Sequence, residues 1–373
     1  RALAPAAAPD RGRRVGIMGA LARRKRGKVA ILHGAVAPDA APDEQDVLVE
    51  VETVGSALAG LGYQPLPLPL GLDLAAAGRR LARLKPDFVF NLVESLRGEG
   101  RLIHLAPSLL DSLGFSYTGS GTEAVYLTSN KPLAKRLMRG AGIATPDWAA
   151  AGELPRFPGP YIVKSVWEHA SIGLEDGSVT GDRGALPALL EQRRQRLGGE
   201  WFVEAFVEGR EFNLSLLGGP EDMELLPPAE MCFVGFPPGK PRIVNYAAKW
   251  DEHSFEFHAT PRRFDFGPED GGLLQRLAAT AKACWRLFDL RGYARVDCRV
   301  DERGEVQVLE VNINPCLSPD AGFAAAAAQA GLDLQDIVAR IIADRGEPVS
   351  PRQAPQPRSR ALAGEARAFE QAR

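Results

Sequence analysis

The chain has 373 residues, a formal net charge of −2 and a sequence pI near 6.3, with 45% hydrophobic and 25% charged residues. These values indicate a soluble globular protein of two or three domains and exclude the strong basic field of a nucleic-acid-binding protein. No apolar run reaches transmembrane length and the start lacks the apolar core of a secretory signal, so we expect a cytoplasmic protein without membrane partners. The cysteines show no metal-site spacing, and no disulfides are expected: Cys232, Cys284, Cys298 and Cys316.

Both ends of the chain are predicted to be disordered tails. Residues 1–27 are rich in Ala, Pro and Arg and include the basic run Arg23-Arg24-Lys25-Arg26, and residues 346–373 show no periodicity. The basic run is also compatible with a nucleic-acid or membrane contact, or with part of a transit peptide. A solvated tail is favoured because no amphipathic or aromatic pattern accompanies the charge.

Strand and helix patterns alternate over residues 28–142. Strands are predicted at 28–36, 65–70 (an edge strand) and 87–93, and helices at 45–61, 72–84, 103–113 and 129–141. Ser129 is the expected N-cap of the last helix, with Gly142 near its C-terminus. This alternation predicts an α/β domain, a parallel sheet with helices on both faces, which binds ligands beyond the carboxyl ends of its strands.

A short buried-type strand, Tyr161-Ile162-Val163-Lys164-Ser165, ends in a lysine and is followed by a polar loop that contains Ser171. A strand that delivers a lysine beside a flexible loop can hold a polyphosphate, because the ammonium and the backbone N–H groups offset its charge. By itself, this pattern favours an ordinary surface lysine at a strand end.

The segment from Glu200 to Phe212 combines a strand-like apolar run with several glutamates. Backbone groups flanked by apolar residues can recognise an adenine, and a carboxylate a few residues further on, such as Glu211, can accept hydrogen bonds from ribose hydroxyls. A strand–loop–strand with exposed acids is the alternative, and it is preferred when the segment is taken alone.

A β-hairpin is predicted around residue 300. If residues 302–305 form the loop, Asp297 lies opposite Glu310 and Arg295 lies opposite Asn312; a two-residue loop shifts the partners but keeps the same face. The other face should pack, because it is apolar: Ala294, Val296, Cys298 and Val300 against Leu309, Val311 and Ile313.

Asp297, Glu310 and Asn312 supply the oxygen ligands that Mg²⁺ takes in phosphoryl-transfer sites. An ordinary exposed hairpin, with Arg295 as a cross-strand partner, accounts for the two acids about equally well. The strand end Asn312-Ile313-Asn314-Pro315 favours the metal site, because an exposed sheet does not require two amides and a proline there.

The motifs occur in a characteristic order: Asn130-Lys131, Val163-Lys164, Phe202-Val203-Glu204, Gly209-Arg210-Glu211, Tyr246-Ala247-Ala248-Lys249-Trp250, Arg295-Val296-Asp297 and Glu310-Val311-Asn312-Ile313-Asn314-Pro315. Together they resemble the motif series of the ATP-grasp superfamily and are most similar to its D-alanine–D-alanine ligase branch. Residues 114–120 also resemble that branch. The resemblance covers residues 28–342.

This resemblance implies an ATP-grasp fold with three domains: an N-terminal parallel-sheet domain (28–142), a central lobe (143–205) and a C-terminal lobe (206–345) that carries the Mg²⁺ site. ATP would lie between the last two. The implied roles are phosphate contacts from Lys131, Lys164 and Lys249, adenine contacts from Glu204 and the backbone through Val207, a ribose contact from Glu211, two Mg²⁺ ions on Asp297, Glu310 and Asn312 with Mn²⁺ as an alternative, and a catalytic set of Arg295, Lys249 and Ser171.

The implied activity is ATP-dependent ligation of a small-molecule carboxylate and an amine, either an amino acid or a peptide. The carboxylate would form an acyl phosphate, the amine would add, and ADP and phosphate would be released. Positioning and charge neutralisation supply most of such catalysis, and water must be excluded. The segments 165–174 and 246–254 are candidate lids. Only the resemblance points to a homodimer.

Several departures from the branch affect its substrate contacts. The stretch from His33 to Ala40 lacks the glutamate expected to grip the first alanine, Ala321 stands where a serine is expected, and Cys316 replaces a glycine. The phosphate loop, residues 168–171, lacks its usual small residues. Because losing hydrogen-bond partners costs large factors in discrimination, we expect a substrate pair other than two D-alanines, and Asp320 favours a second amine.

Alternative roles remain for single residues and for the whole chain. A nucleophilic role for Cys316 and an acid–base role for His169 are possible in principle. Structural or solvated roles are favoured for both residues. The chain is alternatively a ligase that adds an amino acid to a larger peptide-like acceptor, or a non-catalytic ATP-binding relative. The complete set of metal ligands and lysines argues against the last of these.

Overall fold

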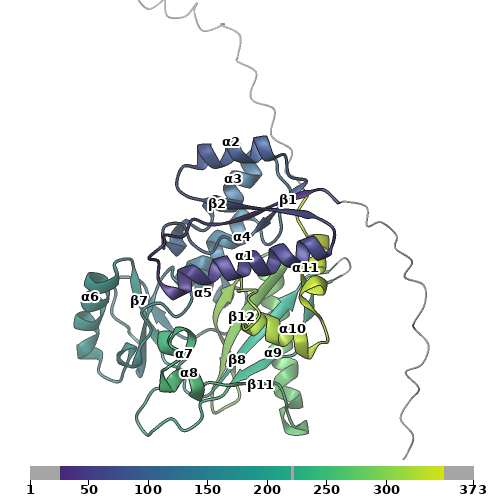
Figure 1. Ribbon diagram of the computed structural model, residues 1–373. Coiled ribbons are helices and arrows are strands. Elements are labelled where there is room, and N and C mark those ends of the chain that lie inside the picture. Colours follow the sequence, from purple (N-terminus) through teal and green to yellow (C-terminus); the bar gives the residue numbers. More distant parts are fainter. Residues whose placement is uncertain (1–25, 220–221, 348–373) are drawn as a thin grey trace, which may run out of the picture.

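A computed structural model describes residues 26–219 and 222–347 (Figure 1). The predicted tails, 1–27 and 346–373, therefore lie almost entirely outside the described residues. In the described part, no helix is both long and apolar enough to cross a membrane. Three sheets organise this part of the chain.

The N-terminal sheet has the order β2-β1-β3, and its strands are parallel. The elements of this region are β1 (Lys28–Gly34), α1 (Pro42–Gly60), β2 (Gln64–Leu70), α2 (Leu74–Leu84), β3 (Phe88–Asn91) and α3 (Leu105–Leu113). Val29 and Ile31 of β1 pack in one cluster with α1, whereas Ala30 and Leu32 pack in another with α2 and α3. Successive side chains alternate between the faces of a strand, so the predicted parallel sheet with helices on both faces is confirmed.

A helix was predicted over residues 129–141 with Ser129 as its N-cap, and the predicted start of this helix is wrong. Two helices meet there, α4 (Thr122–Ser129) and α5 (Lys131–Gly140). The Ser129 hydroxyl donates back to Val125 within α4, and the Asn130 side chain instead accepts from the N–H of Leu133 at 2.9 Å. Pro132 fits the first turn of α5, where its missing N–H has no helical partner to lose.

We expect Asn130→Ala to lower the free energy of unfolding by about 1 kcal/mol, because the N–H of Leu133 loses its acceptor. Asn130→Ser keeps a side-chain acceptor and should retain most of the stability. Urea denaturation of both variants measures the difference. Equal losses in the two variants would show that the amide does not act as a cap.

The second sheet is antiparallel and has the order β4-β7-β5-β6. Its elements are β4 (Trp148–Ala149), β5 (Tyr161–Ser165), β6 (Val179–Thr180) and β7 (Trp201–Ala205), with α6 (Leu186–Leu197) packed against it. In Figure 1 this unit projects to one side of the molecule. Lys164 comes near the end of β5, on the strand that pairs with β7.

The third sheet follows the order β11-β10-β8-β12-β13, and β9 pairs with β8. The remaining elements are β8 (Arg210–Leu217), β9 (Glu224–Leu225), β10 (Ala229–Met231), α7 (Tyr246–Trp250), α8 (Phe255–Ala259), β11 (Arg262–Arg263), α9 (Gly271–Leu287), β12 (Tyr293–Val300), β13 (Val306–Asn312), α10 (Gly322–Gln329) and α11 (Leu334–Ala343). Helix α9 packs against one face of this sheet, and α1 and α11 share a buried cluster with Tyr293 on the other. The predicted domain limits stay predictions.

The predicted hairpin is formed by β12 and β13, and the pairs Asp297–Glu310 and Arg295–Asn312 are as expected. The turn is one residue longer than predicted, since Val300 pairs with Val306, and a bulge between Asp297 and Cys298 restores the register. A bulge inserts an extra residue on one strand. Leu309, predicted on the packed face, is therefore only half-buried, and Val306 and Val308 are buried in its place.

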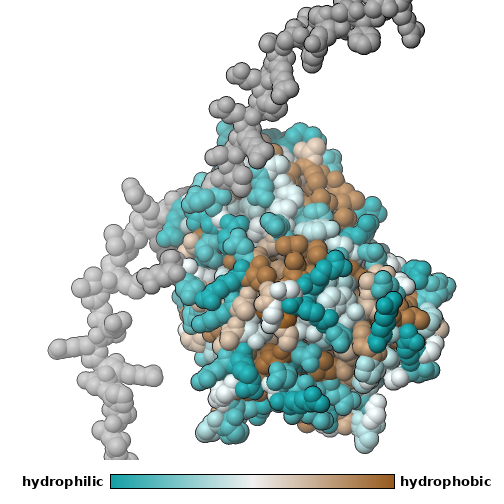
Figure 2. Space-filling model, turned by 180° about the vertical axis from the view of Figure 1, so that it is seen from behind, coloured by the Kyte–Doolittle hydropathy of each residue, from teal (hydrophilic) through white to brown (hydrophobic). Residues whose placement is uncertain are grey.

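Exposed large hydrophobic side chains are spread over several elements rather than gathered on one. Seen from behind, hydrophobic areas of the surface lie among hydrophilic ones (Figure 2).

Candidate active site

A buried carboxylate, Glu204 of β7, joins two lysines. Lys164 of β5 and Lys135 of α5 each lie 2.6 Å from one of its oxygens. Lys135 also donates to the Thr145 hydroxyl, which in turn donates to the carbonyl of Val308 on β13. Burial raises the pKa of Glu204, but the two lysines outweigh it and the net pKa is lowered. The triad thus ties α5 and the second sheet to the hairpin.

Lys135 was missed in the sequence, although a signal was present. It follows Lys131 by four residues on a helix, so the two ammonium groups share a face. Its side chain is 0% exposed, and burial lowers its pKa to about 8 despite the attraction of Glu204.

Lys131, Lys249 and Arg295 all act electrostatically on Glu310 of β13. The Nζ of Lys131 lies 3.5 Å from its Oε2 and donates to the carbonyl of Glu168 at 2.5 Å. His169 Nδ1 lies 3.8 Å from the same oxygen and has no hydrogen-bond partner in the described part of the chain. Burial raises the pKa of Glu310, but Lys131 and the other cations outweigh it, so the pKa is held far below its usual value. Burial, followed by Lys131, lowers the pKa of His169 to about 3, which leaves this imidazole neutral near pH 7.

The three predicted metal ligands lie on neighbouring register positions of one hairpin. Asp297 is opposite Glu310, and it accepts two hydrogen bonds from Arg295, at 2.7 and 2.9 Å, and one from Asn213 at 2.8 Å. The Oδ1 of Asn312 accepts from the N–H of Asn314. Two carboxylates and an amide on adjacent strands form a hard oxygen donor set, which fits Mg²⁺.

The two candidate lids contact each other. The Trp250 indole donates to the carbonyl of Ala170 at 3.1 Å, and the N–H of Tyr246 donates to the carbonyl of Leu174 at 3.0 Å. Just before the second lid, the carbonyl of Val244 accepts from the Ser171 hydroxyl at 2.8 Å. Ala170 and Ser171 both have positive φ, 56° and 61°, so this turn departs from ordinary backbone. The second lid includes α7, which carries Lys249. Burial, followed by the charge of Arg295, lowers the pKa of Lys249.

The predicted ribose ligand, Glu211, forms an ion pair that the sequence did not suggest. Arg299 lies 2.7 Å from it and also donates to the carbonyl of Val207 at 2.8 Å. Its guanidinium stacks over the ring of Phe206 with 5.1 Å to the centroid. Arg299 therefore holds the two predicted nucleotide-contacting positions together.

Acidic residues that the sequence analysis missed lie beside this site. No glutamate was found in the stretch from His33 to Ala40, but the acids come later, on α1. The Tyr246 hydroxyl donates to Asp43 at 2.8 Å, and the Cys316 thiol and Ser318 hydroxyl donate to Asp46. Burial and the neighbouring acids raise the pKa of Cys316, which is typical of a protonated thiol and not of a nucleophile.

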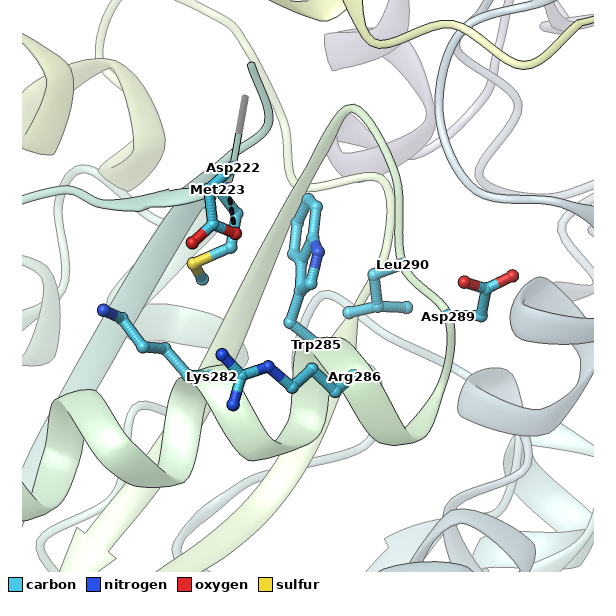
Figure 3. Close-up of a pocket in the computed structure, with 7 residues that line it drawn as sticks. All are labelled: Asp222, Met223, Lys282, Trp285, Arg286, Asp289 and Leu290. Atoms are coloured by element: carbon cyan, nitrogen blue, oxygen red, sulfur yellow. Dashed lines mark hydrogen bonds between the residues drawn. The ribbon is translucent and has the colours of Figure 1, made fainter. Parts of the chain in front are cut away.

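A cavity of about 300 Å³ lies elsewhere, where Asp222 and Met223 face the C-terminal part of α9 (Figure 3). Its lining includes Lys282, Trp285 and Arg286, but none of the predicted site residues. Most of the predicted site residues lie instead on α5, α7, β5, β7, β8 and the β12–β13 hairpin.

This combination of a parallel N-terminal sheet and two further sheets that surround lysines and a hairpin of acids is that of an ATP-grasp ligase. Residues 139–343 match the family model described as the D-ala D-ala ligase C-terminus. The chain belongs to the D-alanine–D-alanine ligase family of ATP-grasp ligases, which form C–N bonds using ATP and a divalent metal.

Similar proteins and solved structures match most of this chain. The chain is 30% identical over 332 residues to a D-alanine–D-alanine ligase of Moorella thermoacetica, covering 84% of this chain and 98% of that protein. It is 30% identical over 263 residues to the uncharacterized protein y4sG of Sinorhizobium fredii, covering 68% of this chain and 73% of that one. The crystal structure of the D-alanine–D-alanine ligase from Bacillus anthracis complexed with ATP has the same fold, with a TM-score of 0.64, 22% identity and coverage of 84% of this chain and 96% of that one.

Proposed function

We propose that the protein joins a carboxylate to an amine through an acyl phosphate, and that its substrate pair is not two D-alanines. The observation that carries the proposal is the charge arrangement at the hairpin. Glu310 and Asp297 lie opposite each other, and Lys131, Lys249 and Arg295 all act electrostatically on Glu310. Such an arrangement suits a polyphosphate bridged by divalent cations, because transfer between two anions requires their repulsion to be offset.

The nucleotide would lie against both lobes. Lys131, Lys164 and Lys249 would contact the phosphates. Glu204, for which an adenine contact was expected, is buried between Lys135 and Lys164 and would instead align Lys164, which it holds at 2.6 Å. The backbone through Val207 would face the adenine, with Glu211 at the ribose. Asp297, Glu310 and Asn312 would hold two Mg²⁺ ions, replaceable by Mn²⁺, which would neutralise the phosphate charge.

The two chemical steps of the proposed reaction depend on Arg295 and on residues of the two lids. An oxygen of the substrate carboxylate attacks the γ-phosphorus of ATP and ADP leaves; the amine then adds to the carbonyl carbon, loses a proton, and phosphate leaves. Arg295 would stabilise the negative charge at the reacting carboxylate. Ser171 and Lys249 belong to the two segments that contact each other, and these segments would keep water from the acyl phosphate.

Changes among the residues expected to contact the substrates support the proposal that these are not two D-alanines. The Ser318 hydroxyl donates to Asp46. Ala321 stands at the position where a serine was expected. A site without its specific hydrogen-bonding groups discriminates poorly for the ligand that needed them.

A matrix of carboxylates against amines, scored by phosphate release with ATP and Mg²⁺, tests the proposal. We expect release with pairs other than D-alanine alone, with mass spectrometry identifying an amide product. Turnover of D-alanine alone as fast as any other pair would refute the substrate part of the proposal. A peptide product would instead identify a larger acceptor, and no substrate-dependent release of ADP with any pair would identify a non-catalytic ATP-binding protein.

A further inference from the structure

A second cavity, of about 70 Å³, lies between the N-terminal sheet and the loop that follows β5. Its lining is rich in acids: Asp43, Glu44, Glu94 and Glu168. Asp46 and Glu50 do not line this cavity, but they follow Asp43 on α1 by three and seven residues, so the three share one face of the helix. We call Asp43, Asp46, Glu50 and Glu94 the acidic pocket.

The acidic pocket has no cationic partner in direct contact. Within residues 26–219 and 222–347, none of its four carboxylates has an ion-pair partner within 4.0 Å. The side-chain hydrogen bonds that they accept come from neutral groups: the hydroxyls of Tyr246 and Ser318, the Cys316 thiol and the N–H of Leu317. Glu50 is buried and the other three are half-buried, and carboxylates that are removed from water are normally paired, so the cluster has room for a positively charged partner.

The carboxylates also repel one another. Burial, followed by Asp46, raises the pKa of Glu94 to about 7, even though Arg295 and Lys249 act in the opposite direction. Burial, followed by Glu94, raises the pKa of Glu50 well above its usual value. Both shifts have the direction that a bound cation would reverse.

Tyr293 gives an independent sign of a ligand. Its side chain is fully buried, yet its hydroxyl has no hydrogen-bond partner in the part of the chain that the structure describes. It comes two residues before Arg295 on β12, hence on the same strand face. Glu50, Glu94 and Cys316 all act electrostatically on it, which places the hydroxyl beside the acidic pocket. Buried hydroxyls normally have a partner, so a polar group of a ligand would complete this one.

We propose that the acidic pocket binds a diamino carboxylic acid, with both ammonium groups toward its carboxylates and the substrate carboxylate toward Arg295 and Lys249. The inference rests on the proposed ligase function and deepens it by naming the class of one substrate. A monoamino acid brings one ammonium to a cluster of acids that repel one another, whereas a diamino acid brings two and offsets more of that repulsion. The opposite end of the site is cationic, so the two ends of such a substrate meet complementary charges.

Isothermal titration of the full chain with lysine, ornithine and norleucine, each as both enantiomers, tests the pocket without turnover. Norleucine matches lysine in length and lacks only the second ammonium. We expect one of the diamino acids to bind at least ten times more tightly than norleucine. Equal affinities for norleucine and every diamino acid would overturn the proposal.

Variants locate the effect. Asp46→Asn and Glu94→Gln should each reduce the preference for the diamino acid over norleucine by about tenfold, since each removes one charged partner of the second ammonium. Tyr293→Phe keeps the ring and should weaken diamino acid binding several-fold. Glu52→Gln, an exposed position on the same helix, should change nothing. A preference unchanged in Asp46→Asn, Glu94→Gln and Tyr293→Phe would place the ligand elsewhere and refute the pocket.

Failure of the pocket and failure of the ligase are distinguishable. Phosphate release with other amino acids but no diamino acid binding would refute the pocket alone. Tight diamino acid binding without ADP release for any amine partner would refute the proposed function and leave the pocket standing.

Discussion

Glu310→Gln is expected to lower ATP- and Mg²⁺-dependent phosphate release by about a thousandfold, the scale on which a preorganised charge contributes to catalysis. The side chain lies opposite Asp297 and within 3.5 Å of the Lys131 ammonium. The amide has nearly the same shape but no charge. The variant would therefore lose one of the proposed metal ligands, and it removes the carboxylate on which Lys131, Lys249 and Arg295 act.

The measurement is steady-state phosphate release over a Mg²⁺ titration, together with ATP affinity with and without Mg²⁺. The wild type should bind ATP more tightly with Mg²⁺, and the variant should lose most of that gain. Glu302→Gln, an exposed acid in the turn of the same hairpin, is the matched control and should behave as wild type. Full activity in Glu310→Gln would show that the metal assignment is wrong.

Glu204→Gln is expected to lower the free energy of unfolding by about 3 kcal/mol, because removing one partner of a buried ion pair leaves uncompensated charge. Here two lysines would lose their shared carboxylate, and the Lys135 side chain is 0% exposed. Glu153→Gln makes the same change at an exposed position and should alter stability little. Urea denaturation near pH 7 measures both.

The pH dependence of stability in the wild type and in Glu204→Gln provides a further test. The pKa of Glu204 is lowered below its ordinary value of 4.5, so the carboxylate contributes stability that is fully present above pH 4.5 and is lost as the pH falls through the folded-state pKa. The gap in stability between wild type and Glu204→Gln should therefore narrow on acidification below 4.5. A gap that is absent at pH 7, or that widens in acid, would contradict this account of the triad.

Much of the hairpin could be predicted because its information is local. Side chains alternate along each strand, so Asp297 and Glu310 fall on one face whatever the turn does. The turn itself was predicted one residue too short, and the register survived because the bulge adds a compensating residue. Leu309 was misplaced for the same reason, since bulges leave no regular pattern in a single sequence.

The sequence by itself determined the alternation of helices and strands, the polar face of the hairpin and the order of motifs that places the chain in its family. These properties depend on residues a few positions apart, which share a turn of helix or a face of a strand. The tertiary structure alone shows which distant polar and charged groups meet: Asp46 with Ser318, Lys135 with Glu204, and Arg299 with Glu211. The physical reason is that such pairs are made by the packing of separate elements, which no local periodicity records.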